Sequence, residues 1–168
     1  MPHVPAPVIE KLGIARKALS KSISQYKSGK ENLYFFYRFV VLPWELEWCD
    51  NKFLMKIGDL DDFCSQNSFS IKSFESTAKL KLALDTKFIS ETKKYSGAFW
   101  FVRKDTKPKD LLRHLRNSFS HGNFTIGQRN RQKCINLQNM DGNHIKAKGF
   151  IPLELLKSLV DSSSKCMV

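Results

Sequence analysis

The spacing of apolar residues predicts a chain built mainly from helices. In residues 8–26, apolar side chains recur every three or four positions and form one stripe, as in an amphipathic helix. Residues 32–41 are apolar on nearly all sides, which predicts a buried central helix that ends or kinks at Pro43. Residues 58–68 are interpreted as a polar connection. Residues 71–102 are expected to be largely helical, as one long helix or two in line.

A clear helix start follows at Asp105-Thr106-Lys107-Pro108, where a capping residue precedes a proline in the first turn. The helix should run from about residue 109 to Ser120. It should end at His121-Gly122, because glycine readily adopts the left-handed conformation that closes many helices.

Strand signals are concentrated after that helix. Residues 124–126 suggest a short strand, and residues 134–140 and 143–151 alternate around Asp141-Gly142, which predicts a hairpin. Pro152 then opens a short last helix. The pairing expected across the hairpin joins Ile135 and Leu137 to Ile145 and Ala147. The apolar face expected on the last helix consists of Leu153, Leu156, Leu159 and Val160.

Length and charge narrow the class of protein. The 168 residues predict a single domain over residues 1–168, with residues 1–7 and 162–168 loosely ordered. Lys and Arg number 28 against 16 Asp and Glu, which gives a formal net charge of +12. Such an excess attracts polyanions, so nucleic acid and an anionic membrane surface are the candidate partners. A basic surface without any partner is the simpler alternative.

The chain shows no secretory signal, and its most apolar run, residues 35–44, is broken by Arg38 and Pro43. It falls short of the roughly 20 residues that a membrane span needs. The four cysteines have neither paired nor zinc-finger spacing, so we expect reduced thiols, a cytoplasmic location and no structural metal.

The helix predicted near residues 109–120 has two distinct faces. The apolar arc, expected to face the core, consists of Leu111, Leu112, Leu115 and Phe119. The opposite arc carries Arg113, Arg116, Asn117 and Ser120, with His121 at its edge. A solvated polar face is the plain alternative, because cations near a helix C-terminus are favoured by the helix dipole.

The sequence of residues 112–124, Leu-Arg-His-Leu-Arg-Asn-Ser-Phe-Ser-His-Gly-Asn-Phe, resembles the HEPN superfamily. The motif of that superfamily is an Arg, usually followed by a polar residue such as Asn, and then a His after a short gap. Arg116, Asn117 and His121 match it directly.

The resemblance implies a mainly α fold, a HEPN-like up-and-down four-helix bundle, here with a small C-terminal β-hairpin and a short last helix. It also implies a homodimer and metal-independent cleavage of RNA without a cofactor, often in toxins or antiviral defence effectors. Some HEPN toxins paired with a nucleotidyltransferase antitoxin carry Tyr two residues after the His. This chain has Asn123 there, so that mode of regulation is not supported.

The residue types suit RNA cleavage by attack of the 2′-hydroxyl on the adjacent phosphate. Histidine exchanges protons near neutral pH, and arginine presents a fork that matches phosphate oxygens. We therefore expect Arg116, His121 and Asn117 to be catalytic, with Asn117 orienting the imidazole or the phosphate. Because one chain offers one such His, a composite active site between two chains fills both proton-transfer roles more easily.

Two other functions remain open on the same residues. The domain could bind nucleic acid without cleaving it, or it could be a protein-interaction module that meets an acidic antitoxin or inhibitor. The expected RNA-binding residues are Arg113, Ser120, Arg129, Arg131 and Lys133. The last three alternate, so on a strand they would share one face. A solvated edge of the hairpin explains them equally well.

Further candidates have simple structural explanations. Asp59, Asp61 and Asp62 lack the rest of a calcium loop, so a solvated turn or helix start is expected rather than a metal site. His114 lies between the polar and apolar arcs and is interpreted as a boundary residue, with a supporting role behind the site as the alternative. The residues expected to pack in the core rather than stack on bases are Trp44, Trp48 and Trp100.

Overall fold

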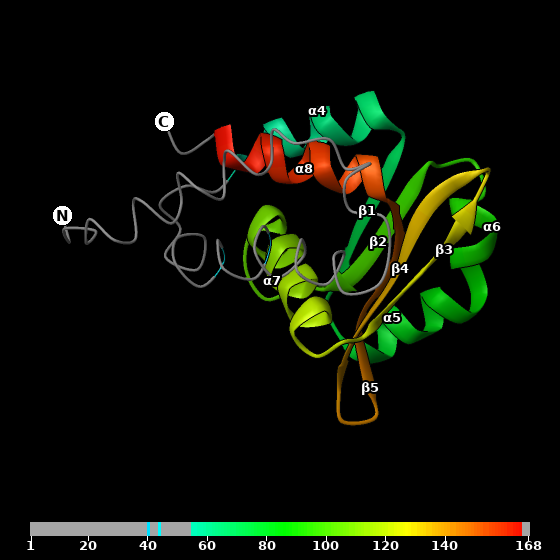
Figure 1. Cartoon of the computed structure of the whole chain (residues 1–168). Helices are drawn as coiled ribbons and strands as arrows, with labels where there is room; N and C mark the ends of the chain where they lie inside the picture. The colour runs from blue at the N-terminus through cyan, green and yellow to red at the C-terminus, as the bar shows by residue number, and fades with distance from the viewer. Residues whose placement is uncertain (1–39, 41–43, 45–54, 166–168) are drawn as a thin grey trace, which may run out of the picture.

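The structure is a computed structural model, and it describes Val40, Trp44 and residues 55–165. Within these residues, a five-stranded mixed sheet carries helices on both of its faces (Figure 1). The helix predicted for residues 8–26 lies outside the described residues. So does the helix predicted for residues 32–41, except for Val40, which is buried.

The elements follow one another along the chain without long connections. Their order is α4 (Ile57–Asn67), β1 (Phe69–Phe74), α5 (Thr77–Ala83), the π-helical turn η4 (Leu84–Phe88), α6 (Ile89–Thr92), β2 (Gly97–Val102), α7 (Lys107–Ser120), β3 (Phe124–Arg129), β4 (Gln132–Asp141), β5 (His144–Pro152) and α8 (Leu153–Lys165).

The strands lie in the order β1-β2-β5-β4-β3. β1 and β2 are parallel and are joined through α5, η4 and α6, whereas β5 pairs antiparallel with both β2 and β4. β5 therefore occupies the centre of the sheet, although it follows the other four strands in sequence.

The sheet shows that the expected mainly α four-helix bundle is wrong. The structure is an α/β fold, and residues 71–102, expected to be helical, contain most of β1, the α5–α6 segment and β2. Strand β2 is buried on both faces, so its apolar residues do not alternate and its sequence can be mistaken for part of a buried helix. Residues 58–68, expected to be a polar connection, are almost entirely within helix α4.

Two hydrophobic clusters cover the two faces of the sheet. The larger one joins the sheet to α4, α7 and α8, with Phe99 and Phe101 of β2 fully buried in it. The smaller one joins α5 and η4 to the other face around Trp100, whose indole N–H donates to the hydroxyl of Ser70 at 3.2 Å. Figure 1 shows α7 and α8 on one side of the sheet and α5 and α6 on the other. Trp44 and Trp100 pack in the core, as predicted, and Trp48 lies outside the described residues.

The local signals after residue 105 are confirmed. Helix α7 begins after Thr106 with Pro108 in its first turn and ends at His121, and Gly122 has a φ of +67°. The apolar arc expected to face the core is buried; it consists of Leu111, Leu112, Leu115 and Phe119.

The predicted hairpin exists, but its predicted pairing is wrong. Ile135 pairs with Ile151, and Leu137 with Gly149. A two-residue turn holds Asp141 opposite His144, so residues farther from the turn on β4 must meet residues farther from the turn on β5. An irregularity between Asn139 and Met140 shifts the register once more.

The last helix is longer than expected. Pro152 precedes α8, whose predicted apolar residues are buried, and the helix continues through the serine-rich segment to Lys165. The Ser163 hydroxyl is buried and donates to the Leu159 carbonyl at 2.9 Å. Residues 162–165 are therefore helical and not a loose tail.

Candidate nucleic-acid cleavage site

A pocket of about 500 Å³ lies along the polar face of α7, between this helix and the ends of β2, β4 and β5. We call it the basic pocket, because four cationic side chains and two imidazoles line it against a single carboxylate. Its wall consists of Val102, Arg103, Lys104, Arg113, His114, Asn117, His121, Asn139, Met140, Asp141 and Lys146.

Helix α7 supplies one whole side of the basic pocket. Arg113, Asn117 and His121 are spaced four residues apart, so they lie above one another on one helix face. His121 is exposed at the helix C-terminus, where the chain turns away through Gly122. The structure therefore brings these three of the predicted site residues together in one pocket wall.

Arg116 stands beside this face and not in the wall of the pocket. Its guanidinium is half-buried, and its Nη1 donates to the Oδ1 of Asn117 at 2.7 Å. With that oxygen engaged, the amide nitrogen of Asn117 is the part of the side chain that can donate elsewhere. Asn117 therefore links Arg116 to the pocket that His121 lines.

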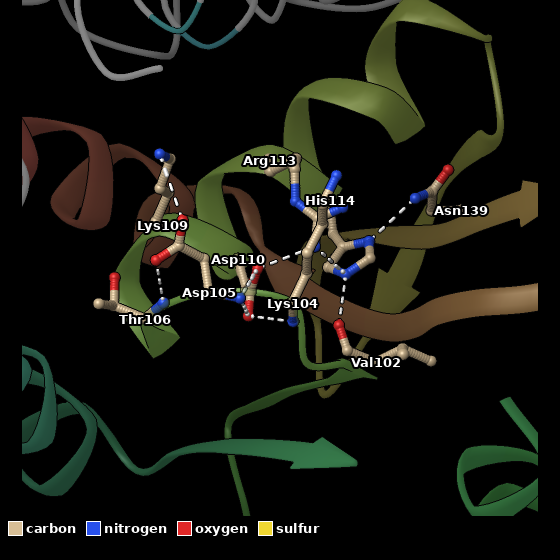
Figure 2. A network of polar contacts seen from close by, with 9 residues as sticks. All are labelled: Val102, Lys104, Asp105, Thr106, Lys109, Asp110, Arg113, His114 and Asn139. Atoms are coloured by element: carbon tan, nitrogen blue, oxygen red, sulfur yellow. Dashed lines mark hydrogen bonds and ion pairs between the residues drawn. The ribbon is translucent and has the colours of Figure 1, made fainter. Parts of the chain in front are cut away.

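A buried carboxylate holds Arg113 in place. Asp110 is fully buried, and its Oδ1 accepts from the Nη2 of Arg113 at 2.8 Å. The same carboxylate accepts from the backbone N–H groups of Lys104 and Asp105, at 2.9 Å and 3.0 Å (Figure 2). Asp110 thus fixes both the arginine and the loop that carries Arg103 and Lys104 into the wall of the basic pocket.

His114, in the wall of the basic pocket, is also buried, and it is not a boundary residue. Its Nε2 lies 3.0 Å from the Val102 carbonyl oxygen, and its Nδ1 lies 2.9 Å from the Nδ2 of Asn139. A carbonyl can only accept, so Nε2 carries the proton and Nδ1 accepts from the amide. The Nη2 of Arg113, 3.4 Å from Nε2, therefore faces another donor and makes no hydrogen bond there.

The neutral form of His114 agrees with its surroundings. Burial lowers its pKa to about 4, although the hydrogen bond to Val102 acts in the opposite direction. The imidazole of His114 thus connects α7 to Val102 of β2 and to Asn139 of β4 (Figure 2). It therefore joins α7 to the two strands as a neutral part of the pocket wall.

The remaining candidate residues lie elsewhere. Ser120 is exposed on α7 outside the basic pocket. Arg129 ends β3, Arg131 lies in the following turn with a φ of +64°, and Lys133 is on β4, so the three do not form one strand face. The guanidinium of Arg129 lies 3.6 Å from the ring centroid of Phe150, in the smaller cluster on the opposite side of the sheet from α7.

The sequence reasoning missed the part of the wall that comes from the sheet. Arg103 and Lys104 follow β2 directly, and their only signal is two adjacent cations before a helix start. Asn139 and Lys146 carry no local signal, because the strand pairing alone brings them to α7. In the described ranges, no group of three or more His, Cys, Asp or Glu side chains is placed to hold a metal ion. Asp59 lies in the first turn of α4 and is exposed with Asp61 and Asp62.

Comparison with known proteins gives one match. The model of the family described as HEPN pEK499 p136 matches residues 10–168. Searches of the curated proteins and of the solved structures found no match. Over Val40, Trp44 and residues 55–165, no helix is long and apolar enough to cross a membrane.

Proposed function

The chain belongs to a HEPN family, and from that membership we propose that it is an endoribonuclease that cleaves RNA without a metal ion. The observation that carries the proposal is that Asn117 and His121, which match the HEPN motif, line one basic pocket, with Arg116 bonded to Asn117. The family match covers residues 10–168, a range that contains the motif.

In the proposed reaction, the 2′-hydroxyl oxygen forms a bond to the adjacent phosphorus, and the bond from phosphorus to the 5′-oxygen breaks. One proton leaves the attacking hydroxyl, and one is delivered to the departing 5′-oxygen. The products are a 2′,3′-cyclic phosphate and a 5′-hydroxyl. His121 carries a proton in this scheme, because imidazole both accepts and donates protons near neutral pH.

The developing negative charge on the phosphate is stabilised in this proposal by the arginines. Arg116 keeps its charge at any working pH and presents several donors to phosphate oxygens. Arg113, held by Asp110, adds a second fixed guanidinium in the wall of the basic pocket. Preorganised donors of this kind need no rearrangement as charge develops, which makes them effective in catalysis.

The test is cleavage of a labelled single-stranded RNA by purified variants. We expect His121→Ala and Arg116→Ala to lower kcat by at least about 100-fold, within the range that removal of a proton carrier or charge stabiliser produces. The matched controls are His144→Ala, which changes an exposed histidine outside the pocket, and Lys81→Ala, which changes an exposed cation on α5. Full activity in both site variants would end the assignment.

Two further measurements test the attack by the 2′-hydroxyl and the independence from metal ions. Replacing the 2′-hydroxyl at the cleaved position with hydrogen should abolish cleavage, while excess EDTA should leave the rate unchanged. Binding without cleavage in the wild-type protein would instead identify a non-catalytic nucleic-acid-binding module.

We also propose that the active site is shared between two copies of the chain. With a fixed amount of wild-type protein, a growing excess of His121→Ala should reduce cleavage after subunit exchange, because mixed dimers contain only one active imidazole. Independent sites predict a constant rate. A cytoplasmic toxin or defence effector, restrained by a partner protein, is the biological role most consistent with this proposal.

A further inference from the structure

A second pocket, of about 430 Å³, opens where the chain leaves α7 and enters β3. We call it the amide pocket, because three side-chain amides lie around an apolar floor. It is lined by Phe88, Gly122, Asn123, Phe124, Thr125, Asn136, Leu137, Gln138, Met140, Lys148, Gly149 and Phe150. Its volume lies within the range of small-ligand sites, roughly 300–1,000 Å³.

The amide pocket adjoins the basic pocket at the edge of the sheet. Pairing between β3 and β4 ends at Phe124 and Leu137, so β4 extends beyond its neighbour. Met140 in this extension lines both pockets. On the other side, His121 lines the basic pocket and the next residue, Gly122, lines the amide pocket. Phe88 and Phe150 place the amide pocket on the face of the sheet opposite α7, so a strand bound by its phosphate near His121 reaches it by passing over the sheet edge at Met140.

The amides of this pocket have little to do within the protein. Within the part of the chain that the structure describes, the side chains of Asn123 and Asn136 make no hydrogen bond. The Nε2 of Gln138 lies 3.1 Å from the sulfur of Met140, which is a weak acceptor. Backbone groups nonetheless fix this segment, since the Gln138 N–H donates to the Asn123 carbonyl at 3.0 Å. The amides are thus held at a fixed place with donors and acceptors to offer.

The chemistry of the amide pocket suits a nucleobase. Asn and Gln side chains present a donor and an acceptor side by side, which matches the edges of bases. Phe124 and Phe150 give the pocket aromatic surface, and bases splayed out of a single strand are commonly held against such surface. The exposed Lys148 at the rim adds a charge for a phosphate. A peptide partner would not require this combination beside a pocket lined by four cations.

We propose that the amide pocket binds an unpaired base next to the scissile phosphate and sets the sequence preference of cleavage. This proposal rests on the proposed endoribonuclease function, which it deepens by naming single-stranded RNA with a preferred base as the substrate. Asn136 and Gln138 read the edge of the base, and neither residue takes part in the chemical step.

The experiment measures binding of four 2′-O-methyl homo-oligonucleotides, which cannot be cleaved. The wild-type protein should bind one of the four at least about fivefold more tightly than the weakest, the lower end of what one bidentate amide–base pair contributes. The variant Asn136→Ser with Gln138→Ala should reduce that preference to about twofold or less. Asn143→Ala changes an exposed amide in the β4–β5 turn and should leave the preference unchanged.

Each outcome distinguishes the two proposals. Equal binding of the four oligonucleotides by a protein that cleaves RNA would overturn the base subsite alone, as would a preference that survives in the double variant. A base preference without any cleavage would overturn the endoribonuclease and retain the subsite. Absence of binding, together with a changed molecular mass of the double variant in light scattering, would assign the amide pocket to contact between copies and overturn the subsite.

Discussion

At the scale of single residues, the site depends on two buried polar side chains that do not react. Asp110 and His114 are 0% and 1% exposed, and each is satisfied by backbone or side-chain partners. Such networks stabilise a single arrangement only when every member is bonded. Arg113 and the loop before α7 take their positions from this network.

The stability of the protein should depend on pH through His114. Its pKa is about 4 in the folded chain, mainly because it is buried, whereas an unfolded histidine titrates near 6.5. Between these values the unfolded chain binds the extra proton, so the free energy of unfolding falls as the pH drops below about 6.5. From pH 7 to pH 5 we expect a loss of about 2 kcal/mol from this group, measured by urea unfolding.

Burial sets the sign of this effect, and the charged groups around His114 change its size. Arg113 and Lys146 disfavour its protonated form and Asp110 favours it, but burial is the largest contribution. His144→Gln, at an exposed position, should leave the pH dependence as in the wild type. An NMR titration that showed His114 protonating near pH 6.5 in the folded protein would contradict the prediction without the need for a variant that folds.

At the scale of elements, those with local sequence signals were predicted correctly, whereas the pairing of strands far apart in the sequence was not. Helix α7, the hairpin and α8 are announced by proline, glycine and Asp-Gly signals close to their ends. β1 and β2 pair with each other across more than twenty residues, and nothing local marks either as a strand. The same limit explains the site: the α7 residues could be found from the sequence, whereas Lys146 depends on where β5 lies.

Gly149 lies where β5 and β2 approach each other closely. A Cβ at Gly149 would lie 2.1 Å from the Ala98 carbonyl oxygen and 2.7 Å from the Cα of Phe99, both of them backbone atoms that cannot move aside cheaply. We expect Gly149→Ala to destabilise the protein by about 3 kcal/mol, the upper end of the roughly 1–3 kcal/mol that overpacking usually costs, because backbone atoms stand in the way. Thermal or urea unfolding measures the change.

Gly127→Ala is the matched control for this prediction. In β3 the nearest atom to an added Cβ is 3.8 Å away, so the substitution should be neutral or slightly stabilising. Equal effects of the two substitutions would show that β5 and β2 are not in this close contact.

At the scale of the whole molecule, the chain has a net charge of +12, and the fold brings four cations from three parts of the chain into the wall of the basic pocket. The charge alone predicted a polyanionic partner without saying where it binds. The fold brings Arg103, Lys104 and Lys146 to the polar face of α7, and we propose that the polyanion binds there.

RNA binding should therefore weaken steeply with salt. If the four cations of the basic pocket contact phosphates, the logarithm of the association constant falls with the logarithm of the salt concentration with a slope of about −3 for a single strand. The affinity then drops about 50-fold between roughly 50 and 200 mM salt. Arg103→Ala with Lys146→Ala should reduce the slope by about 1.4. Lys81→Ala, at an exposed position on α5, serves as the control and should leave the slope unchanged. A slope that the double substitution does not alter would place the RNA elsewhere on the surface.

The central position of β5 has a consequence for synthesis on the ribosome. β2 and β4 have no shared partner until residues 144–152 have been translated and have left the exit tunnel. Lys146 reaches its place in the pocket only at that moment. A nascent chain thus carries the motif of α7 for some time before its pocket is complete. Under the proposed function, this order would spare the messenger RNA that is still being read.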